Sequence, residues 1–399
     1  MTVLSKRVSE LQGSSTLASA GRAHVLRTQG RDIINLGIGE LEFDVPTNVK
    51  HAAKRAIDEG HGRSTPVTGI DELKEAIGAK LLRDNDLRYG SEQIIVGTGT
   101  KQVIFNAMFA TLDHGDEVIV PAPYWVSYPE IVRMAGGTPV VVPTSMETGF
   151  KLQPEQLARA ITPRTKWLLL NSPNNPTGAV YTPDELVALA EVLTRHPSVF
   201  ILSDDIYERF VYRGSFRTIA QCAQALFGRT LTVNGVSKSH AMIGWRLGYG
   251  AGPAPLVAAM SKVQSQVTSG TCSVVQLAAI EALNGTQEPT RAFIQAFRAR
   301  RALAIEGLSA IPGLSFAGTD GAFYLYPRCE EYVGRRTARG TTIGTDMDLA
   351  DYLMTEASVA CIGGQAFGMS PHLRLAYVCD ESRVVEAMKR IRVALALLE

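Results

Sequence analysis

The chain of 399 residues is long enough for two domains with a large buried core, and its 45% hydrophobic and 20% charged residues are typical of a globular protein. Its net charge of +1 gives no electrostatic reason to expect a nucleic acid or an acidic membrane as a partner. The five cysteines are dispersed without CxxC spacing, which argues against a disulfide frame or a zinc site and indicates free thiols in a reducing compartment. Because the chain also lacks an apolar signal segment and any long apolar run, and its histidines lack metal-ligand spacing, we expect a cytoplasmic protein without a metal site.

The N-terminal part of the chain contains short predicted elements. Apolar residues at helical spacing predict helices at 20–29 and 48–59, and residues 33–36 read as a short strand. This strand ends in Gly37-Ile38-Gly39-Glu40. Glycines after a strand allow a ligand to approach the backbone closely, although a plain turn is equally compatible with them.

The middle of the chain alternates strands with helices. Strands are predicted at 93–97, 117–121, 138–142, 166–171, 200–203 and 230–235. Helices are predicted between most of them, at 101–112, 126–134, 154–161, 183–195 and 218–226. Strands separated by helices of this size predict an α/β domain with a mainly parallel sheet, and such sheets bind ligands at the carboxyl ends of their strands.

The last third of the chain predicts a second domain. Its elements are a long helix at 290–310, strands at 321–326, 359–362 and 372–377, and a final helix at 381–398. We expect residues 46–295 to form a large domain, and residues 1–45 and 296–399 to form a smaller α+β domain.

Lys238 is the first candidate for catalysis. It follows the predicted strand at 230–235 and has small and apolar neighbours. A lysine acts as a nucleophile only when its amine loses a proton, which an apolar pocket and a nearby cation promote. Arg246, eight residues further on, could supply that cation and could also hold a phosphate. A lysine on an ordinary turn is the alternative, unless matching partner residues occur elsewhere.

Two segments at strand ends could bind the parts of a phosphorylated aromatic ligand. Gly99, Thr100 and Lys101 begin a helix, where free backbone N–H groups and the helix dipole favour an anion. The segment is not a Walker loop, and an ordinary strand–helix turn remains the alternative. Trp125 lies in an aromatic cluster after another strand and could stack on a heteroaromatic ring, although core packing is the commoner role of such clusters.

Two further strand ends carry polar groups that suit the same ligand, and a later strand carries an arginine that suits a carboxylate. Asn175 lies in a proline-rich turn that presents amide side chains rigidly. Asp204 could pair with a protonated pyridine nitrogen and Tyr207 could donate to the ring oxygen, while a capping Asp and a core Tyr are the alternative. Arg374 lies on an otherwise apolar strand, where its planar fork suits a carboxylate or a structural salt bridge.

Together these motifs resemble the class I/II aminotransferases over essentially the whole chain. The stretches at 101–106, 115–120, 123–133, 171–181 and 231–235 are similar to the bacterial subgroup of aspartate and aspartate/prephenate aminotransferases. The resemblance implies the α/β fold called fold type I, with a large domain around a mainly parallel sheet and a smaller α+β domain. It also implies pyridoxal 5′-phosphate as cofactor and a homodimer.

The resemblance assigns cofactor roles to the same residues. Lys238 would be the Schiff-base lysine and proton carrier, and Asp204 the partner of the pyridine nitrogen. Asn175 and Tyr207 would hold the ring oxygen, and Trp125 would stack on the ring. The phosphate would be bound by Ser237, Arg246 and the helix start formed by Gly99, Thr100 and Lys101.

Substrate roles also follow from the resemblance. The α-carboxylate of the substrate would be bound by Arg374, the backbone of Gly39 and the side chain of Asn175, beside Trp125. In the subgroup a lysine at the position of Lys101 meets the distal carboxylate, and hydroxyls that match Ser14 and Thr16 assist it. These residues make aspartate or glutamate the leading amino donor and a 2-oxo acid the acceptor.

Three positions depart from the family pattern and keep alternatives open. Ser64 replaces a tyrosine that reaches the phosphate of the neighbouring subunit, Gly235 replaces a phosphate-binding serine, and Leu41 replaces a proline. A specialised enzyme for an unusual or aromatic amino acid is therefore an alternative. Prephenate is second to the acidic substrates, because that branch usually has a basic residue near Gln12.

Two other classes of function share this scaffold. One is a pyridoxal-phosphate lyase, decarboxylase or racemase, because a fold does not determine its reaction. The other is a non-catalytic binding or regulatory protein, which usually carries an additional DNA-binding module for which this sequence has no spare segment. Reversible transamination with ping-pong kinetics is the leading hypothesis.

Overall fold

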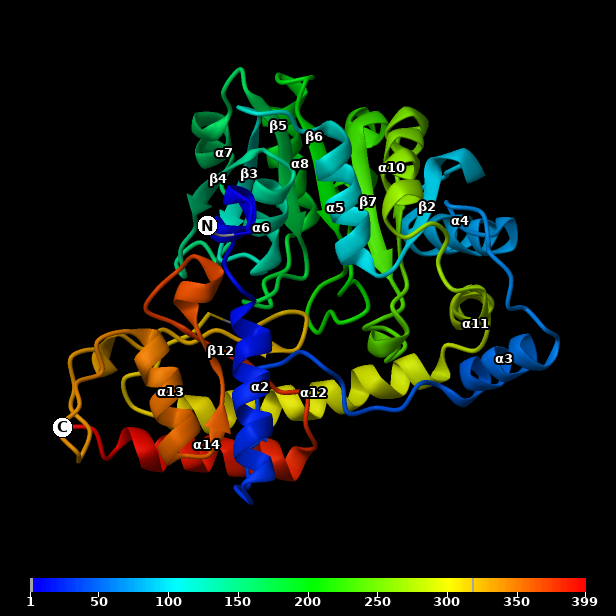
Figure 1. Ribbon diagram of the computed structural model, residues 1–399. Helices are drawn as coiled ribbons and strands as arrows, with labels where there is room; N and C mark the ends of the chain where they lie inside the picture. Colours follow the sequence, from blue (N-terminus) through cyan, green and yellow to red (C-terminus); the bar gives the residue numbers. More distant parts are fainter. Residues whose placement is uncertain (1–2, 318) are drawn as a thin grey trace.

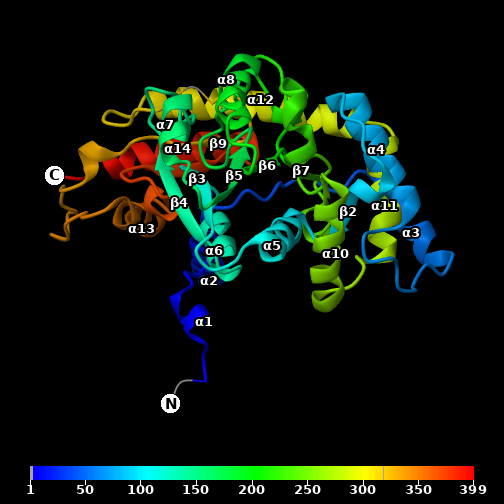
Figure 2. The same cartoon turned by 90° about the horizontal axis from the view of Figure 1, so that it is seen from above.

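The computed structural model describes residues 3–317 and 319–399 and contains two groups of elements. The larger group surrounds a central sheet, and the smaller group lies below it in Figure 1. Helix α1 (Lys6–Glu10) belongs to an N-terminal arm that leaves the body of the molecule, as Figure 2 shows. None of the helices in the described ranges combines the length and apolar character that are needed to span a bilayer.

Seven strands form the central sheet in the order β2-β8-β7-β6-β5-β3-β4. They are β2 (Ile94–Gly97), β3 (Glu117–Ala122), β4 (Thr138–Pro143), β5 (Thr165–Asn171), β6 (Phe200–Asp204), β7 (Thr230–Gly235) and β8 (Gly248–Ala251). β8 pairs antiparallel with both of its neighbours, and the other adjacent strands are parallel. The predicted α/β fold with a mainly parallel sheet is thus confirmed, and the carboxyl ends of its parallel strands meet at one edge.

β8 is the strand of this sheet that was not predicted. Its sequence, Gly-Tyr-Gly-Ala, has a low intrinsic preference for strand because glycine supplies no side chain to pack. The missing side chain of a glycine also lets the backbone of β8 approach a neighbouring element closely. A Cβ atom on Gly248 would overlap the backbone nitrogen of Thr100 at the start of the helix that follows β2.

Helices cover both faces of the sheet. One face carries α5 (Thr100–Thr111), α6 (Ser127–Met134) and α10 (Ala254–Val267), and the other carries α7 (Pro154–Ala160) and α8 (Pro183–Thr194), as Figure 2 shows. Beyond β2, a separate apolar cluster is formed by α3 (Thr47–Asp58), α4 (Asp71–Asn85) and α11 (Ser273–Asn284). Apolar side chains at helical spacing face the sheet in each case, which accounts for the layered core.

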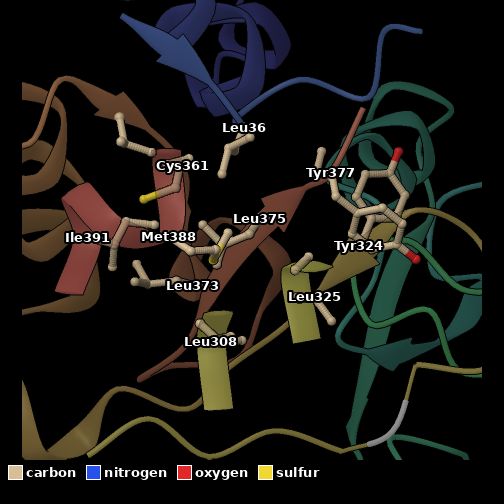
Figure 3. Packing of buried hydrophobic residues seen from close by; sticks show 14 of the residues in the cluster. Leu36, Leu308, Tyr324, Leu325, Cys361, Leu373, Leu375, Tyr377, Met388 and Ile391 are labelled. Carbon is tan, nitrogen blue, oxygen red and sulfur yellow. The ribbon is translucent and has the colours of Figure 1, made fainter. Parts of the chain in front are cut away.

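The smaller group of elements contains two small sheets and several helices. β1 (Ile34–Asn35) pairs with β10 (Val359–Ala360), while β11 (Ile362–Gly363) and β9 (Tyr324–Leu325) flank β12 (Leu373–Ala376). The helices are α2 (Ser15–Thr28), α12 (Glu288–Ser309), α13 (Asp346–Glu356) and α14 (Glu381–Leu395). Figure 3 shows side chains from β12, α12 and α14 meeting in one apolar core.

Several predicted elements differ in detail from the structure. The helix predicted at 218–226 is interrupted at Ala223, whose φ of −138° separates α9 (Ile219–Cys222) from a 3₁₀ turn at Gln224–Arg229. The strand predicted at 359–362 is two strands with different partners, β10 and β11. Helices α10, α11 and α13 were not predicted.

The boundary predicted between residues 295 and 296 falls inside α12, a continuous helix that extends from the large group of elements into the small one in Figure 1. The division of the chain at residues 46 and 295 therefore stays a prediction.

Candidate active site

A cavity of about 310 Å³ lies at the carboxyl ends of the parallel strands, between the two groups of elements. The structure brings together nearly all the predicted site residues around it. Those that line the cavity are Ser14, Thr16, Gly39, Thr100, Lys101, Trp125, Asn175, Asp204, Tyr207, Ser237, Lys238, Arg246 and Arg374. Gly99 does not line the cavity but lies beside it, against the guanidinium of Arg246.

The amine of Lys238 lies inside this cavity, three residues after the end of β7. Its Nζ donates a hydrogen bond to the carbonyl oxygen of Gly39 at 2.6 Å. Burial, together with the positive charges of Arg374 and Arg246, lowers the pKa of Lys238 to about 8 against the opposing effect of Glu40. An amine with this pKa is partly unprotonated near neutral pH, as a lysine nucleophile requires.

Arg374 is a buried guanidinium without a carboxylate partner among the described residues. It lies on β12 with 2% of its surface exposed. Its Nη1 donates to Oδ1 of Asn175 at 3.1 Å, and its Nη2 donates to the carbonyl oxygen of Gly37. In the part of the chain that the structure describes, its Nε has no acceptor. None of the ion pairs within the described ranges includes Arg374, so the structural salt bridge left open by the sequence is not formed. A buried cation in this state requires an anion from outside the chain.

Asp204 closes β6 at the bottom of the cavity. Its Oδ2 accepts a hydrogen bond from the Tyr128 hydroxyl at 2.7 Å, and its Oδ1 accepts one from the backbone N–H of Ile206 at 3.3 Å. Burial raises the pKa of Asp204 to about 6, and these two hydrogen bonds oppose that rise. A buried carboxylate of this kind is stabilised by a cationic group placed in the cavity.

The start of α5 forms a cradle beside Arg246. Gly99 has a φ of +85°, and a Cβ atom at this position would overlap the Arg246 guanidinium. Within the described part of the chain, the backbone N–H groups of Thr100 and Lys101 have no acceptor. These free donors, the helix dipole and the guanidinium make the cradle an anion site.

Lys101 and Trp125 both line the cavity and lie against each other. The Nζ of Lys101 lies 4.9 Å from the centre of the Trp125 ring. Burial and the charge of Arg246 lower the pKa of Lys101. Ser14 begins α2, and its hydroxyl accepts from the backbone N–H of Leu17 at 3.4 Å.

Two tyrosines of the cavity had not been assigned a role from the sequence. Tyr128 contacts Asp204 as described, and the Tyr324 hydroxyl lies 2.8 Å from the Tyr207 hydroxyl. Both side chains are buried, and a buried tyrosine on a helix or strand is indistinguishable in sequence from ordinary core packing. The roles of the two hydroxyl groups follow only from their hydrogen-bond partners, Asp204 and Tyr207, which are distant in sequence.

The three departures from the family pattern have different surroundings. Ser64 is exposed and does not line the cavity. Leu41 is 7% exposed and joins the apolar core of the smaller group of elements. Gly235 leaves little room for a larger residue, because a Cβ atom there would lie 3.0 Å from the carbonyl oxygen of Leu247.

Comparisons with known proteins identify the family to which the chain belongs. The model of the family "Aminotransferase class I and II" matches residues 31–391. The aspartate/prephenate aminotransferase of Cereibacter sphaeroides is 51% identical over 98% of both chains, and an aspartate aminotransferase of Rhizobium meliloti is 47% identical over 97% of this chain and 95% of its own.

Solved structures of the same family have the same fold. The aspartate aminotransferase from Rhizobium meliloti superimposes with a TM-score of 0.96 at 46% identity over 100% of both chains. The Thermus thermophilus enzyme, solved with maleate, gives 0.92 at 43% identity over 99% of this chain and 100% of its own. The chain therefore belongs to the class I and II aminotransferases, with their fold-type I architecture, and is an aminotransferase.

Proposed function

We propose that the protein transfers the amino group of aspartate or glutamate to a 2-oxo acid, with pyridoxal 5′-phosphate held in the cavity. The observation that carries this proposal is the buried Arg374, which has no carboxylate partner within residues 3–317 and 319–399 and lines the same cavity as Lys238. The relatives named aspartate aminotransferase and aspartate/prephenate aminotransferase support the choice of substrate.

The residues present fit the proposed cofactor. The free N–H groups at the start of α5, with Arg246 and Ser237, suit a phosphate. The buried carboxylate of Asp204 suits a protonated pyridine nitrogen, and Trp125 offers a flat ring beside it. When bound, pyridoxal phosphate supplies an electron-withdrawing ring that accepts the electron pair left when the substrate α-carbon loses its proton.

The amine of Lys238 is the proposed carrier of that proton. Lys238 lines the cavity and the pKa of its amine is lowered, so that the amine can accept a proton from the α-carbon and release it again. With the cofactor bound, Asp204 would keep the pyridine nitrogen protonated, and Tyr207 and Asn175 would hold the ring oxygen. By fixing the cofactor in the cavity, these residues would bring the substrate within reach of the Lys238 amine.

Substrate binding in the proposal depends on two cationic groups that line the cavity. Arg374 and Asn175, already in contact at 3.1 Å, bind the α-carboxylate. Lys101, with Ser14 and Thr16, binds the distal carboxylate of an acidic substrate. Because the amino acid and the oxo acid use the same groups in turn, the two half-reactions follow ping-pong kinetics.

The experiment that tests the proposal is single-turnover spectroscopy of the purified protein loaded with pyridoxal phosphate. Aspartate and glutamate should change the absorbance of the bound cofactor rapidly, and Lys101→Ala should slow this change for both. If only aromatic or basic amino acids react, the substrate assignment is wrong while the aminotransferase class stands. If no cofactor absorbance appears after loading, the cofactor assignment is wrong.

Prephenate is the second candidate, as an amino acceptor. The relative from Cereibacter sphaeroides with 51% identity is named an aspartate/prephenate aminotransferase. Gln12, where the prephenate branch usually has a basic residue, donates its backbone N–H to Glu130 on α6 at 3.1 Å. Amino transfer from aspartate to prephenate, compared with transfer to 2-oxoglutarate in the same assay, separates the two acceptors.

We also propose a homodimer. Its support is the N-terminal arm, on which Val3, Leu4 and Val8 are exposed while the arm projects from the body in Figure 2. Exposed apolar side chains on a projecting segment are stabilised by contact with a second chain. Light scattering at assay concentration should give twice the mass of one chain.

The free cysteines support a location in the reducing cytoplasm.

A further inference from the structure

Tyr324 lies where three groups of the site meet. Its ring is buried on β9, and the guanidinium of Arg374 lies 5.0 Å from the ring centre. Its hydroxyl lies 2.8 Å from the Tyr207 hydroxyl. The same hydroxyl packs against Gly39, where a Cβ atom would overlap it. The side chain of Tyr324 therefore contacts Arg374, Tyr207 and Gly39. These are the residues proposed to bind the substrate carboxylate and to hold the ring oxygen of the cofactor, and the residue that accepts the hydrogen bond from Lys238.

The direction of the hydrogen bond between the two tyrosines follows from a count of hydrogens. Within the described ranges, the Tyr207 hydroxyl is the only hydrogen-bond partner of the Tyr324 hydroxyl. Burial raises the pKa of both tyrosines, so both keep their hydrogen at neutral pH. A hydroxyl donates only one hydrogen. If Tyr207 donates to the ring oxygen of the cofactor, Tyr324 must be the donor between the two.

We propose that Tyr324 is a positioning residue that acts through Tyr207, holding its hydroxyl as a donor toward the ring oxygen of the cofactor. This inference rests on the proposed function. A hydroxyl that accepts a hydrogen bond becomes a stronger donor, because the bonds of a chain polarise one another. Tyr324 therefore strengthens the bond from Tyr207 to the ring oxygen as well as orienting it.

Tyr324 also joins this hydrogen bond to the strand that binds the substrate. It pairs with Ala376 on β12, two residues from Arg374. Tyr207, in contrast, follows β6 of the central sheet. The two hydroxyls thus connect the small sheet that carries Arg374 with the edge of the large sheet that holds the cofactor. The position of Arg374 and the orientation of Tyr207 depend on the same side chain.

Tyr324→Phe tests the proposal because it keeps the ring under Arg374 and removes only the hydroxyl. The readout is the pH midpoint of the absorbance of the bound cofactor. This midpoint is the pKa of the nitrogen through which Lys238 would be joined to the cofactor. The proton on that nitrogen is attracted by the negatively charged ring oxygen beside it. A donor to that oxygen weakens its attraction for the proton, so loss of the donor raises the midpoint. We expect a rise of about 0.5 to 1 pH unit, as for loss of one hydrogen bond.

A comparison with Tyr207→Phe makes the test specific. Tyr207→Phe should raise the midpoint more than Tyr324→Phe does. The midpoint of the double variant should be no higher than that of Tyr207→Phe alone, because Tyr324 acts through Tyr207. Additive shifts would overturn the proposal, since they would mean that Tyr324 acts on the cofactor independently.

Tyr377→Phe is the matched control. Tyr377 is a buried tyrosine of the same group of elements, drawn with Tyr324 in Figure 3, and its hydroxyl donates to the carbonyl oxygen of Ala322 at 3.3 Å. It does not line the cavity, so the midpoint should stay at the wild-type value. A Tyr324→Phe protein that transfers amino groups with an unchanged midpoint overturns the positioning role and leaves the proposed function intact. A wild-type protein that binds no pyridoxal phosphate overturns both.

Discussion

The hydroxyl of Tyr128 donates a hydrogen bond to Oδ2 of Asp204 over 2.7 Å, deep in the cavity. Burial raises the pKa of this carboxyl to about 6, and the Tyr128 hydrogen bond opposes the rise. Tyr128 comes from the start of α6 and Asp204 from the end of β6. The bond therefore links two elements that meet at the carboxyl edge of the sheet, and it helps the carboxyl to stay ionised.

Removing this donor should make Asp204 harder to ionise. In Tyr128→Phe we expect the acid limb of kcat/KM to move upward by about 1 to 2 pH units, because a hydrogen bond to a charged group contributes about 1.5–3 kcal/mol. The pH profile of aspartate transamination is the measurement. Tyr181→Phe removes another buried hydroxyl, which accepts from Leu152 N–H, and should leave the limb in place. A limb that stays at the wild-type pH in Tyr128→Phe would contradict the assignment.

Arg374 should be intolerant of lysine. Arg374→Lys keeps the positive charge but removes the planar fork that contacts Asn175 and Gly37. We expect kcat/KM for aspartate to fall about 10- to 100-fold, which corresponds to one lost charge-assisted hydrogen bond. Steady-state kinetics check this, with the absorbance of the bound cofactor as the control for an intact site. Wild-type kcat/KM in the variant would show that the α-carboxylate binds elsewhere.

The lowered pKa of Lys238 predicts how the protein without cofactor reacts with pyridoxal phosphate. Only the unprotonated amine attacks a carbonyl, so the rate of attachment should rise with pH and reach half of its maximum at about pH 8. Arg374→Leu removes a positive charge that lowers this pKa, so the midpoint should move upward in that variant. Rapid-mixing absorbance measures the rate of attachment in the wild type and in Arg374→Leu. Lys238→Ala should not attach pyridoxal phosphate covalently and should show no turnover. Turnover in this variant would exclude Lys238 as the essential amine.

Gly248 should be essential to the phosphate cradle. In Gly248→Ala, the added Cβ would overlap the backbone nitrogen of Thr100 at the start of α5. The overlap would displace the start of α5, and overpacking of this kind costs about 1–3 kcal/mol. Because the displaced helix start would bind the phosphate less well, we expect the dissociation constant of pyridoxal phosphate to rise about 10-fold or more. Equilibrium titration of the protein without cofactor measures it. Gly244→Ala is the control, because a Cβ there meets nothing within 4 Å. Equal affinities in the two variants would contradict the role of the close approach.

The positions of three central candidate residues could be predicted because each lies at or just after the end of a strand. Asp204, Asn175 and Lys238 all lie just beyond runs of apolar residues that form β6, β5 and β7. In a mainly parallel sheet these ends meet at one edge, so residues far apart in sequence were expected together. The structure confirms that they line one cavity.

Other features could not be predicted because their signal is a contact across the fold. Strand β8 has a glycine-rich sequence that resembles a loop, and only its two antiparallel neighbours make it a strand. The run at 359–362 is apolar throughout, as one buried strand would be, yet its two halves pair with strands of different sheets. The helix predicted at 218–226 ends early because the backbone turns at Ala223.

The sequence by itself determined the family, the parallel α/β core and the chemical types of the site residues. Each of these depends on local patterns, namely apolar periodicity, strand ends and short motifs around Lys238 and Asn175. Only the tertiary structure decided that Arg374 has no carboxylate partner among the residues it describes, that Tyr128 donates to Asp204, and that the Tyr324 hydroxyl meets that of Tyr207. The physical reason is that a hydrogen bond or an unmet charge is a property of two groups in space, and the sequence specifies each group without the distance between them.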